Sequence, residues 1–197
     1  PVDVAQSAEE DPHLWLEDVT GERALTWATE QNKRSLGLLE SEEQRKLQAR
    51  LLSIYDSQAK IPYAFKRGAY LYNFWQDDKN VRGLWRRTSL AEYKKPSPRW
   101  ELMLDIDALA QSEKENWVFA GITWLQPGYE RALIELSRGG GDATVLREFD
   151  IKTKAFVSDG FNLPEAKSQV AWRDLNSVYV GTDFGPGSLT DAGYPRI

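Results

Sequence analysis

The sequence lacks cysteine altogether, and it has one histidine, His13, and one methionine, Met103, in 197 residues. Without cysteine the chain forms neither disulfide bonds nor thiolate metal sites, although this absence does not fix the compartment. No run approaches the roughly 18 apolar residues that a membrane-spanning helix needs. We expect a soluble protein of the cytoplasm or periplasm, with no membrane partner, no metal and no cofactor.

The chain begins with Pro1 and shows no charged and then apolar leader. We therefore expect that residue 1 is not the translation start and that any signal peptide has been removed. Residues 1–10 are small, polar and acidic, and are predicted to form a mobile tail.

Aromatic residues are abundant, with eight Trp, eight Tyr and seven Phe in a chain that is 41% hydrophobic. This composition excludes the disordered class and supplies ample material for a core. The length suits one domain, or one domain with an appended segment.

Positive charge is concentrated in residues 60–100, where ten Lys/Arg stand against three Asp/Glu. The net charge of this block is +7, so the rest of the chain carries −12 of the total of −5. Its segments RGLWRR (82–87) and KKPSPR (94–99) mix cations with tryptophan, as proteins that bind single-stranded nucleic acid do. No nucleic-acid-binding fold is recognisable, so we favour cations that solvate strand edges, with any stacking on Trp85 being structural.

Residues 1–57 are predicted to hold a tail and two amphipathic helices. The first helix is expected over about 22–36, capped by Thr20, with Leu25, Ala28 and Trp27 facing inward. The second follows Ser41-Glu42-Glu43-Gln44, which has the spacing of a capping box. Its apolar stripe comprises Leu47, Leu51, Ile54 and Tyr55.

Residues 58–197 are predicted to be short strands in three related units. The first unit contains KIPYAFKRG, AYLYNFWQ, GLWRRTSL and WELMLDI, and the second contains WVFAGITWL, RALIELSR, TVLREFDI and AFVSDG. The third has SQVAWRD and NSVYVGTD, and the chain stops at YPRI before the unit is complete. Turn residues separate the strands: residues 77–80, 139–142 and 151–154.

Four-stranded units repeated in this way indicate the blades of a β-propeller. In AYLYNFW both strand faces are apolar, which is typical of a blade packed between neighbours and not of a sheet with one solvated face. Two and a half blades cannot close a ring of at least four, so we expect an incomplete propeller with exposed strand edges that invite self-association.

The opening segment DPHLWLEDV (11–19), followed by Gly21-Glu22, Trp27 and Gln31-Asn32, resembles the amino-terminal entry of the prolyl oligopeptidase family of serine peptidases. The segment YLYNFWQD (70–77), leading into RGLWRRT (82–88), is similar to the first blade of that family. The later segments LSRGGGDATVLREFD and VYVGTDFGPGSLTDAGYPR resemble blades of its bacterial branch. The resemblance extends from about residue 11 to residue 197.

This resemblance implies a parent protein with two domains. One is a seven-bladed propeller that limits substrate size, and the other is a carboxy-terminal α/β-hydrolase domain whose Ser–Asp–His triad cleaves short peptides, typically after proline. It further implies that the amino-terminal helices belong with the hydrolase domain, and that Trp15 and Leu16 act as a clasp on it. The expected partners are the missing blades, the hydrolase domain and short peptides.

Catalytic residues are not expected within this chain. A serine hydrolase needs a nucleophile, a base and an oxyanion hole, and no Gly-x-Ser-x-Gly elbow occurs here. Ser188 lies in GPGSLTD, which lacks the second glycine, and His13 is the only available imidazole. The resemblance places His13 where the family usually has an aromatic residue, so we predict that it is not catalytic.

Two further motifs have simple structural explanations. Asp105 and Asp107 would place two carboxylates on one face of a strand, but the sequence offers no set of six oxygens for Ca²⁺. We predict a solvated strand end there. Gly139-Gly140-Gly141 has no following Lys-Ser/Thr, so a hairpin turn is favoured over a phosphate cradle.

Two hypotheses from different classes follow. The first is an amino-terminal fragment of a prolyl-oligopeptidase-like peptidase, which contributes the propeller and the clasp and is inactive alone. The second is a stand-alone, propeller-like module that binds a protein or a nucleic acid. The open reading frame that encodes the chain distinguishes them.

Overall fold

The computed structural model describes residues 11–18 and 20–196, so the predicted tail of residues 1–10 lies outside the described residues. The chain divides into two compact units, residues 1–55 and residues 56–197. Each unit is described by itself.

The first unit is helical. It contains a 3₁₀ helix η1 (Leu14–Glu17) and the helices α1 (Glu22–Leu39) and α2 (Glu42–Tyr55). The predicted cap of the first helix is wrong, because Gly21 occupies the N-cap position without a side-chain cap. A Cβ atom on Gly21 would lie 2.3 Å from Oδ2 of Asp18, so a larger residue there would have to displace the Asp18 carboxylate. The Thr20 hydroxyl instead lies 3.5 Å from Oδ1 of Asp18.

The inward face predicted for α1 is also wrong. Ala24 is its buried residue, while Leu25, Trp27 and Ala28 are exposed. The short helix η1 packs against α1, and most residues of α1 stay exposed in this unit. In α2 the Ser41 hydroxyl accepts a hydrogen bond of 3.1 Å from the backbone N–H of Gln44, which is half of the predicted capping box. Its predicted stripe is exposed: Leu47, Leu51, Ile54 and Tyr55.

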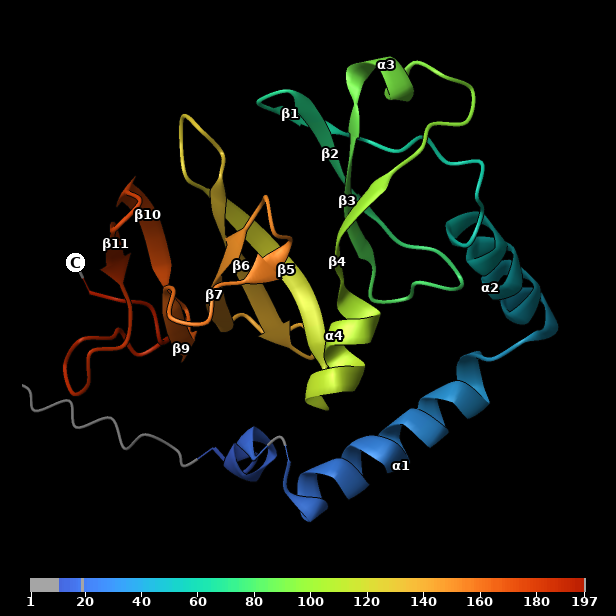
Figure 1. The fold of residues 1–197 in the computed structure, drawn as a ribbon. Helices are drawn as coiled ribbons and strands as arrows, with labels where there is room; N and C mark the ends of the chain where they lie inside the picture. The colour runs from blue at the N-terminus through green and yellow to red at the C-terminus, as the bar shows by residue number, and fades with distance from the viewer. Residues whose placement is uncertain (1–10, 19, 197) are drawn as a thin grey trace, which may run out of the picture. The chain divides into compact units, whose positions relative to one another are not determined.

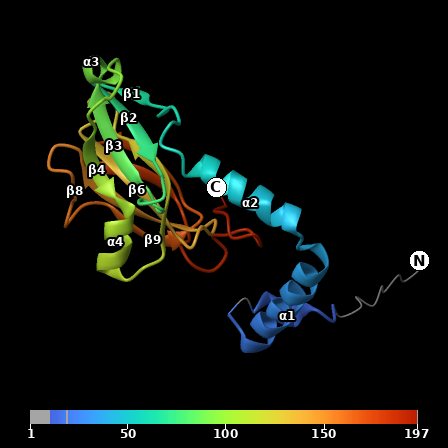
Figure 2. The ribbon, with the colours of Figure 1, turned by 90° about the vertical axis from the view of Figure 1, so that its right-hand side faces the viewer.

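The second unit begins with an antiparallel four-stranded sheet in the order β1-β2-β3-β4. These strands coincide with the four segments of the first predicted blade: β1 (Phe65–Arg67), β2 (Tyr70–Trp75), β3 (Leu84–Ser89) and β4 (Glu101–Asp105). The short helix α3 (Leu90–Tyr93) connects β3 to β4, and α4 (Ile106–Glu113) follows β4. Figures 1 and 2 show these two helices at opposite ends of the sheet.

The second sheet has five strands, with β5-β6-β7-β8 in order and β9 also paired with β7. Its strands are β5 (Trp117–Trp124), β6 (Arg131–Arg138), β7 (Thr144–Asp150), β8 (Ala155–Phe156) and β9 (Asn162–Ala166). The predicted fourth strand over 155–160 is therefore only partly present. Residues 157–160 instead form a turn, in which the N–H of Gly160 donates to the carbonyl of Val157, and β9 takes up the pairing beyond it.

The third sheet is a hairpin of β10 (Gln169–Asp174) and β11 (Ser177–Gly181). After β11 the described chain contains only an isolated bridge between Leu189 and Pro195. Figure 1 shows the three sheets following one another, with neighbouring sheets face to face. This is the predicted architecture, amino-terminal helices followed by an incomplete set of propeller blades.

Candidate functional site: the seams between the blades

The seam between the first two sheets is built from aromatic side chains. Register pairing puts Tyr72 and Phe74 of β2 on the same face as Trp85 of β3, toward the second sheet. Tyr72 and Trp85 both contact Trp124 of β5, with ring centroids 4.8 Å and 5.6 Å apart. Such pairs contribute about 0.5–1.5 kcal/mol each beyond the area they bury, so this cluster fixes the orientation of the two blades.

Two further pairs of aromatic rings belong to the same seam. Phe74 stacks on Phe119 of β5 with a centroid distance of 4.6 Å, and Trp85 meets Phe149 of β7 at 5.3 Å. Trp85 is only 2% exposed, because it lies inside this cluster. Aromatic rings surround Trp85, so its contacts have the structural role that was predicted for them.

The seam between the second sheet and the β10–β11 hairpin depends on Trp172. Its indole N–H donates a 2.9 Å hydrogen bond to the backbone carbonyl of Thr123 in β5. The ring also meets Phe161 edge to face, with centroids 5.5 Å apart. Trp172 thus joins β5 of the second blade to β10, the first strand of the next blade.

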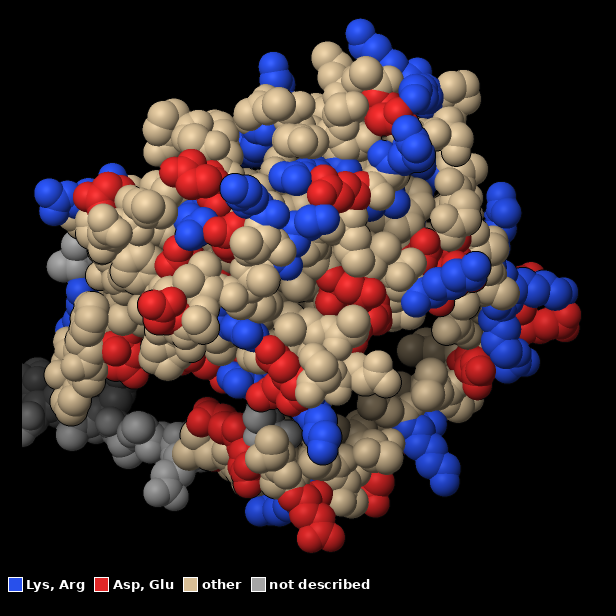
Figure 3. Space-filling view, viewed as in Figure 1, with Lys and Arg blue, Asp and Glu red and all other residues tan. Residues whose placement is uncertain are grey.

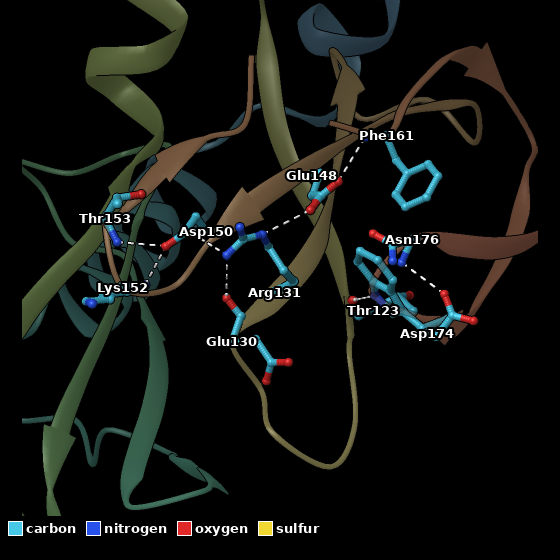
Figure 4. Close-up of polar contacts among 11 residues, drawn as sticks. Thr123, Glu130, Arg131, Glu148, Asp150, Lys152, Thr153, Phe161, Asp174 and Asn176 are labelled. Atoms are coloured by element: carbon cyan, nitrogen blue, oxygen red, sulfur yellow. Dashed lines mark hydrogen bonds and ion pairs between the residues drawn. The ribbon is translucent and has the colours of Figure 1, made fainter. Parts of the chain in front are cut away.

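A charged cluster lies at the start of β6 in the second sheet (Figure 4). The guanidinium of Arg131 donates from Nε to Glu148 at 3.1 Å and from Nη1 to Asp150, both on β7. Burial opposes the charge of Asp150, but hydrogen bonds from the backbone N–H groups of Thr153 and Lys152 and the charge of Arg131 lower its pKa. The cluster therefore closes the predicted 151–154 turn and fixes the end of the blade.

Glu148 holds the loop that follows β8. The residue is only 7% exposed, and its Oε2 accepts a 2.9 Å hydrogen bond from the N–H of Phe161. A Cβ atom on Gly160 would lie 2.7 Å from the same oxygen, so the loop can approach the carboxylate only with glycine at this position. Glu148 was not among the predicted site residues, because it is one of three charged residues in the strand segment TVLREFD and no motif distinguishes it.

The cations of the basic block are largely engaged in internal contacts. Arg82 donates to the carbonyl of Trp117 at 2.7 Å, and so joins the loop before β3 to the start of β5. Arg86 lies over the rings of Trp75 and Trp100, at 4.3 Å and 4.5 Å from their centroids. Burial lowers the pKa of Arg86 to about 10, although the nearby charge of Asp77 opposes this shift.

Arg87 is likewise paired, with Nε 2.6 Å from Glu101, which also accepts from Lys154 at 2.8 Å. The hydrogen bonds from Arg87 and Lys154 lower the pKa of Glu101 to about 2. Figure 3 shows cationic and acidic side chains interspersed over one face of the molecule. These pairings support structural roles for the basic block.

Sequence-predicted site residues fall in separate parts of the fold. His13 is the N-cap residue of η1, and its backbone N–H donates to Oδ1 of Asp11 at 2.8 Å. Ser188 belongs to the second unit, where its hydroxyl donates to the carbonyl of Gly185 and accepts from the N–H of Phe184. The serine thus stabilises a turn.

The prediction that Asp105 and Asp107 share a strand face is wrong, because the strand ends at Asp105 and α4 begins at the next residue. Asp105 caps α4 by accepting from the N–H of Ala108 at 2.9 Å. Asp107 accepts from the backbone N–H groups of Arg82 and Gly83.

The Gly139–Gly141 prediction is confirmed as a hairpin turn between β6 and β7, with Gly139 and Gly140 at φ values of 66° and 86°. Within residues 11–18 and 20–196, no group of three or more His, Cys, Asp or Glu side chains could hold a metal ion. In the same described ranges, no helix is long and apolar enough to cross a membrane.

The opening motif forms a small aromatic cluster in the first unit. The indole N–H of Trp15 donates to the carbonyl of Pro12 at 3.0 Å, and the ring meets Trp27 edge to face at 6.1 Å. Arg23 lies 4.0 Å above the Trp15 ring. A shallow cavity of about 510 Å³ lies along this cluster and the first turns of α1.

Comparison with known proteins identifies the family to which the chain belongs. The family described as prolyl oligopeptidase, N-terminal beta-propeller domain, matches residues 3–194, so the chain belongs to this family. An uncharacterized peptidase of Sinorhizobium fredii is 40% identical over 189 residues, which is 95% of this chain and 26% of that protein. An uncharacterized peptidase of Rickettsia prowazekii is 38% identical over 191 residues, 92% of this chain and 26% of that protein.

Solved structures agree on the fold. A post-proline cleaving enzyme from Rickettsia typhi superposes with a TM-score of 0.84 at 33% identity, covering 92% of this chain and 28% of that one. Oligopeptidase B from Leishmania major is similar in fold alone, with a TM-score of 0.60 at 14% identity, covering 87% of this chain and 24% of that one. The chain thus spans about a quarter of the length of the relatives it matches, and it corresponds to the amino-terminal portion of a prolyl oligopeptidase family peptidase.

Proposed function

We propose that this chain contributes the first blades of a substrate-limiting propeller to a prolyl-oligopeptidase-like serine peptidase, and that it has no peptidase activity by itself. The observation that carries this proposal is the family match over residues 3–194 in relatives that are about four times longer. The only histidine is His13 and no nucleophile elbow occurs. A triad would therefore need residues outside these 197.

The blades are suited to a barrier because their seams are rigid. Aromatic packing joins the first sheet to the second, and the Trp172 hydrogen bond joins the second to the hairpin. A barrier of this kind limits substrates by size only while neighbouring blades stay in register. The proposed substrates are short peptides cleaved after proline, as the name of the Rickettsia typhi relative suggests.

We further propose that residues 1–57 act as a separate segment that docks on the hydrolase domain through the Trp15 cluster. Trp27 is 41% exposed and Leu14 is 53% exposed, so this small motif offers apolar surface next to the charge of Arg23. Apolar patches framed by charge are typical of docking surfaces.

Peptide hydrolysis tests the central proposal. The 197-residue chain and the longer protein encoded with it would each be incubated with a chromogenic prolyl peptide, with and without a serine-directed inhibitor. We expect inhibitor-sensitive cleavage by the longer protein and none by the chain alone. Turnover by the purified chain that the inhibitor does not block would contradict the proposal.

Self-association is a second proposed property. Several edge strands carry protective residues, such as Lys66 in β1, Glu101 in β4 and Pro164 in β9. The edge strand β11 reads Ser-Val-Tyr-Val-Gly, without charge or proline, and within the described chain it pairs only with β10. Such an edge accepts another strand, from a second copy or from a following blade.

A further inference from the structure

Two adjoining cavities lie in the seam between the first and second sheets, on the side of β1 and β5. The first has a volume of about 280 Å³, and aromatic rings form most of its wall, among them Phe65, Phe119 and Trp124. The second, of about 310 Å³, lies where the β1–β2, β5–β6 and β7–β8 turns meet. Arg67 and Tyr72 line both cavities, so the two are neighbours.

The aromatic cavity can receive an apolar side chain. Phe65 is 68% exposed, while Tyr72 and Trp85 at the inner wall are nearly buried. Their rings are held by the seam, since Trp124 contacts both Tyr72 and Trp85. The wall is therefore preformed, which reduces the entropic cost of binding.

The second cavity has an excess of positive charge that is not used internally. Arg67 donates one hydrogen bond, to the carbonyl of Lys66, and across the described chain neither Arg67 nor Lys152 forms an ion pair. Arg87 also lines the cavity, but Glu101 neutralises it. Glu130 is the one carboxylate in the lining, so two available cations face one acid.

We propose that these cavities form a peptide-binding site for a free carboxyl terminus, an inference that rests on the proposed peptidase function. The carboxylate pairs with Arg67 and Lys152, and the side chain of the last residue enters the aromatic cavity. A terminal residue carries its carboxylate and its side chain on one Cα atom, which matches two cavities that share Arg67. Arginine suits a carboxylate because its planar fork offers parallel N–H donors.

Calorimetric titration of the 197-residue chain tests this proposal. The probes are N-acetyl-Gly-Pro-Phe with a free carboxylate, its carboxamide, and N-acetyl-Gly-Pro-Gly with a free carboxylate. We expect the acid to bind about 10-fold more tightly than the carboxamide, because the charge-assisted hydrogen bonds are lost in the amide. The glycine probe should bind about 10-fold more weakly than the phenylalanine probe, since the aromatic cavity stays empty.

Variants separate the site from non-specific attraction. Arg67→Gln and Lys152→Gln should each weaken binding of the acid several-fold and leave the carboxamide unchanged, while Glu130→Gln should tighten binding of the acid. Lys79→Gln is the matched control, because Lys79 is an exposed cation in the β2–β3 loop. Thermal melts followed by circular dichroism confirm that the variants are folded.

Equal binding of acid and carboxamide, no saturable binding of either, or an unchanged affinity in both Arg67→Gln and Lys152→Gln would overturn the site. The titration measures binding and does not depend on whether the longer protein hydrolyses peptides. If the longer protein failed to cleave peptides while the chain bound the acid in an Arg67-dependent manner, the proposed function would be wrong and the site would stand. If the longer protein cleaved peptides and the chain did not bind the acid, the proposed function would stand and the carboxylate site would be wrong.

Discussion

At the scale of single residues, a few buried polar groups have the largest effect on the fold. Glu148 accepts hydrogen bonds from Arg131 and from the N–H of Phe161, and it is nearly buried. A buried hydrogen-bonding group that loses its partner keeps the full cost of its desolvation. Such a residue therefore stabilises the fold through its hydrogen-bonding groups and not through apolar burial.

We predict that Glu148→Ala lowers the free energy of unfolding by about 1–3 kcal/mol, because the N–H of Phe161 loses its acceptor and Arg131 keeps only Asp150 as an acidic partner. Glu148→Gln should cost less, since an amide oxygen can still accept from Phe161. Urea unfolding followed by tryptophan fluorescence measures both. Asp142→Asn is the control: Asp142 pairs with Lys167 at 3.4 Å but is 74% exposed, so its loss should cost about 0–1 kcal/mol. Equal effects of Glu148→Ala and Asp142→Asn would refute the role of Glu148.

The lowered pKa of Glu101 predicts that the stability of the fold depends on pH. Its pKa in the folded chain is about 2, against an ordinary value of 4.5, because of Arg87 and Lys154. A carboxylate with a lowered pKa stabilises the fold above pH 4.5, and this contribution is lost as pH falls from about 4.5 to about 2. Glu101→Gln should therefore flatten the dependence of the melting temperature on pH in this window, and Arg87→Gln should do so in part. A Glu101→Gln chain with the parental slope would contradict this explanation.

At the scale of elements, caps and seams determine where helices and blades end. Asp105 ends β4 and starts α4, because its carboxylate accepts from the N–H of Ala108. Asp107 in the first turn then binds the loop before β3. Two residues predicted as a solvated strand end thus join a helix to its blade.

We predict that Asp105→Ala destabilises the chain by about 1 kcal/mol through loss of the helix cap, whereas Asp105→Asn, which retains an oxygen acceptor, changes stability little. Chemical denaturation of the two variants provides the comparison. The cap would be unimportant if both variants unfolded at the parental denaturant concentration.

The Trp172 seam gives a second prediction at this scale. Trp172→Phe keeps a ring but removes the N–H donor to Thr123, so the hairpin should lose about 0.5–1.5 kcal/mol of local stability. Amide hydrogen exchange should become faster in β10 and β11 and stay unchanged in β2 and β3. Tyr179→Phe serves as the control, because Tyr179 is 64% exposed. Uniform exchange rates in Trp172→Phe and the parent would show that the hydrogen bond does not hold the hairpin.

At the scale of the whole molecule, the propeller is incomplete, and among the residues that the structure describes β11 pairs with β10 alone. We predict that the 197-residue chain self-associates in a concentration-dependent manner and that Tyr179→Lys, which adds a charge to β11, reduces this association. Sedimentation velocity over a range of concentrations measures it. Lys66→Gln, at another edge, should not reduce association, and a chain that stays monomeric at all concentrations would contradict the prediction.

Much of the fold could be predicted from local patterns. The four strands of the first blade and the 139–141 turn follow from alternating apolar residues and turn residues, which act over a few positions. The N-cap position of Gly21 and the early end of the fourth strand of the second blade could not be predicted in this way. They depend on how closely Gly21 approaches Asp18 and Gly160 approaches Glu148.

Local sequence patterns were enough to predict the class of the protein: helices, then strands in repeated units, and no complete triad. Periodicity and motifs carry that information because strand patterns and turn chemistry are local properties of the chain. Which cations are paired and which are available became visible only in the folded chain. The ion pair of Arg131 with Glu148, and the cavity that Arg67 lines together with Lys152, join residues that are distant in the chain and meet only when two strands or two blades pack together.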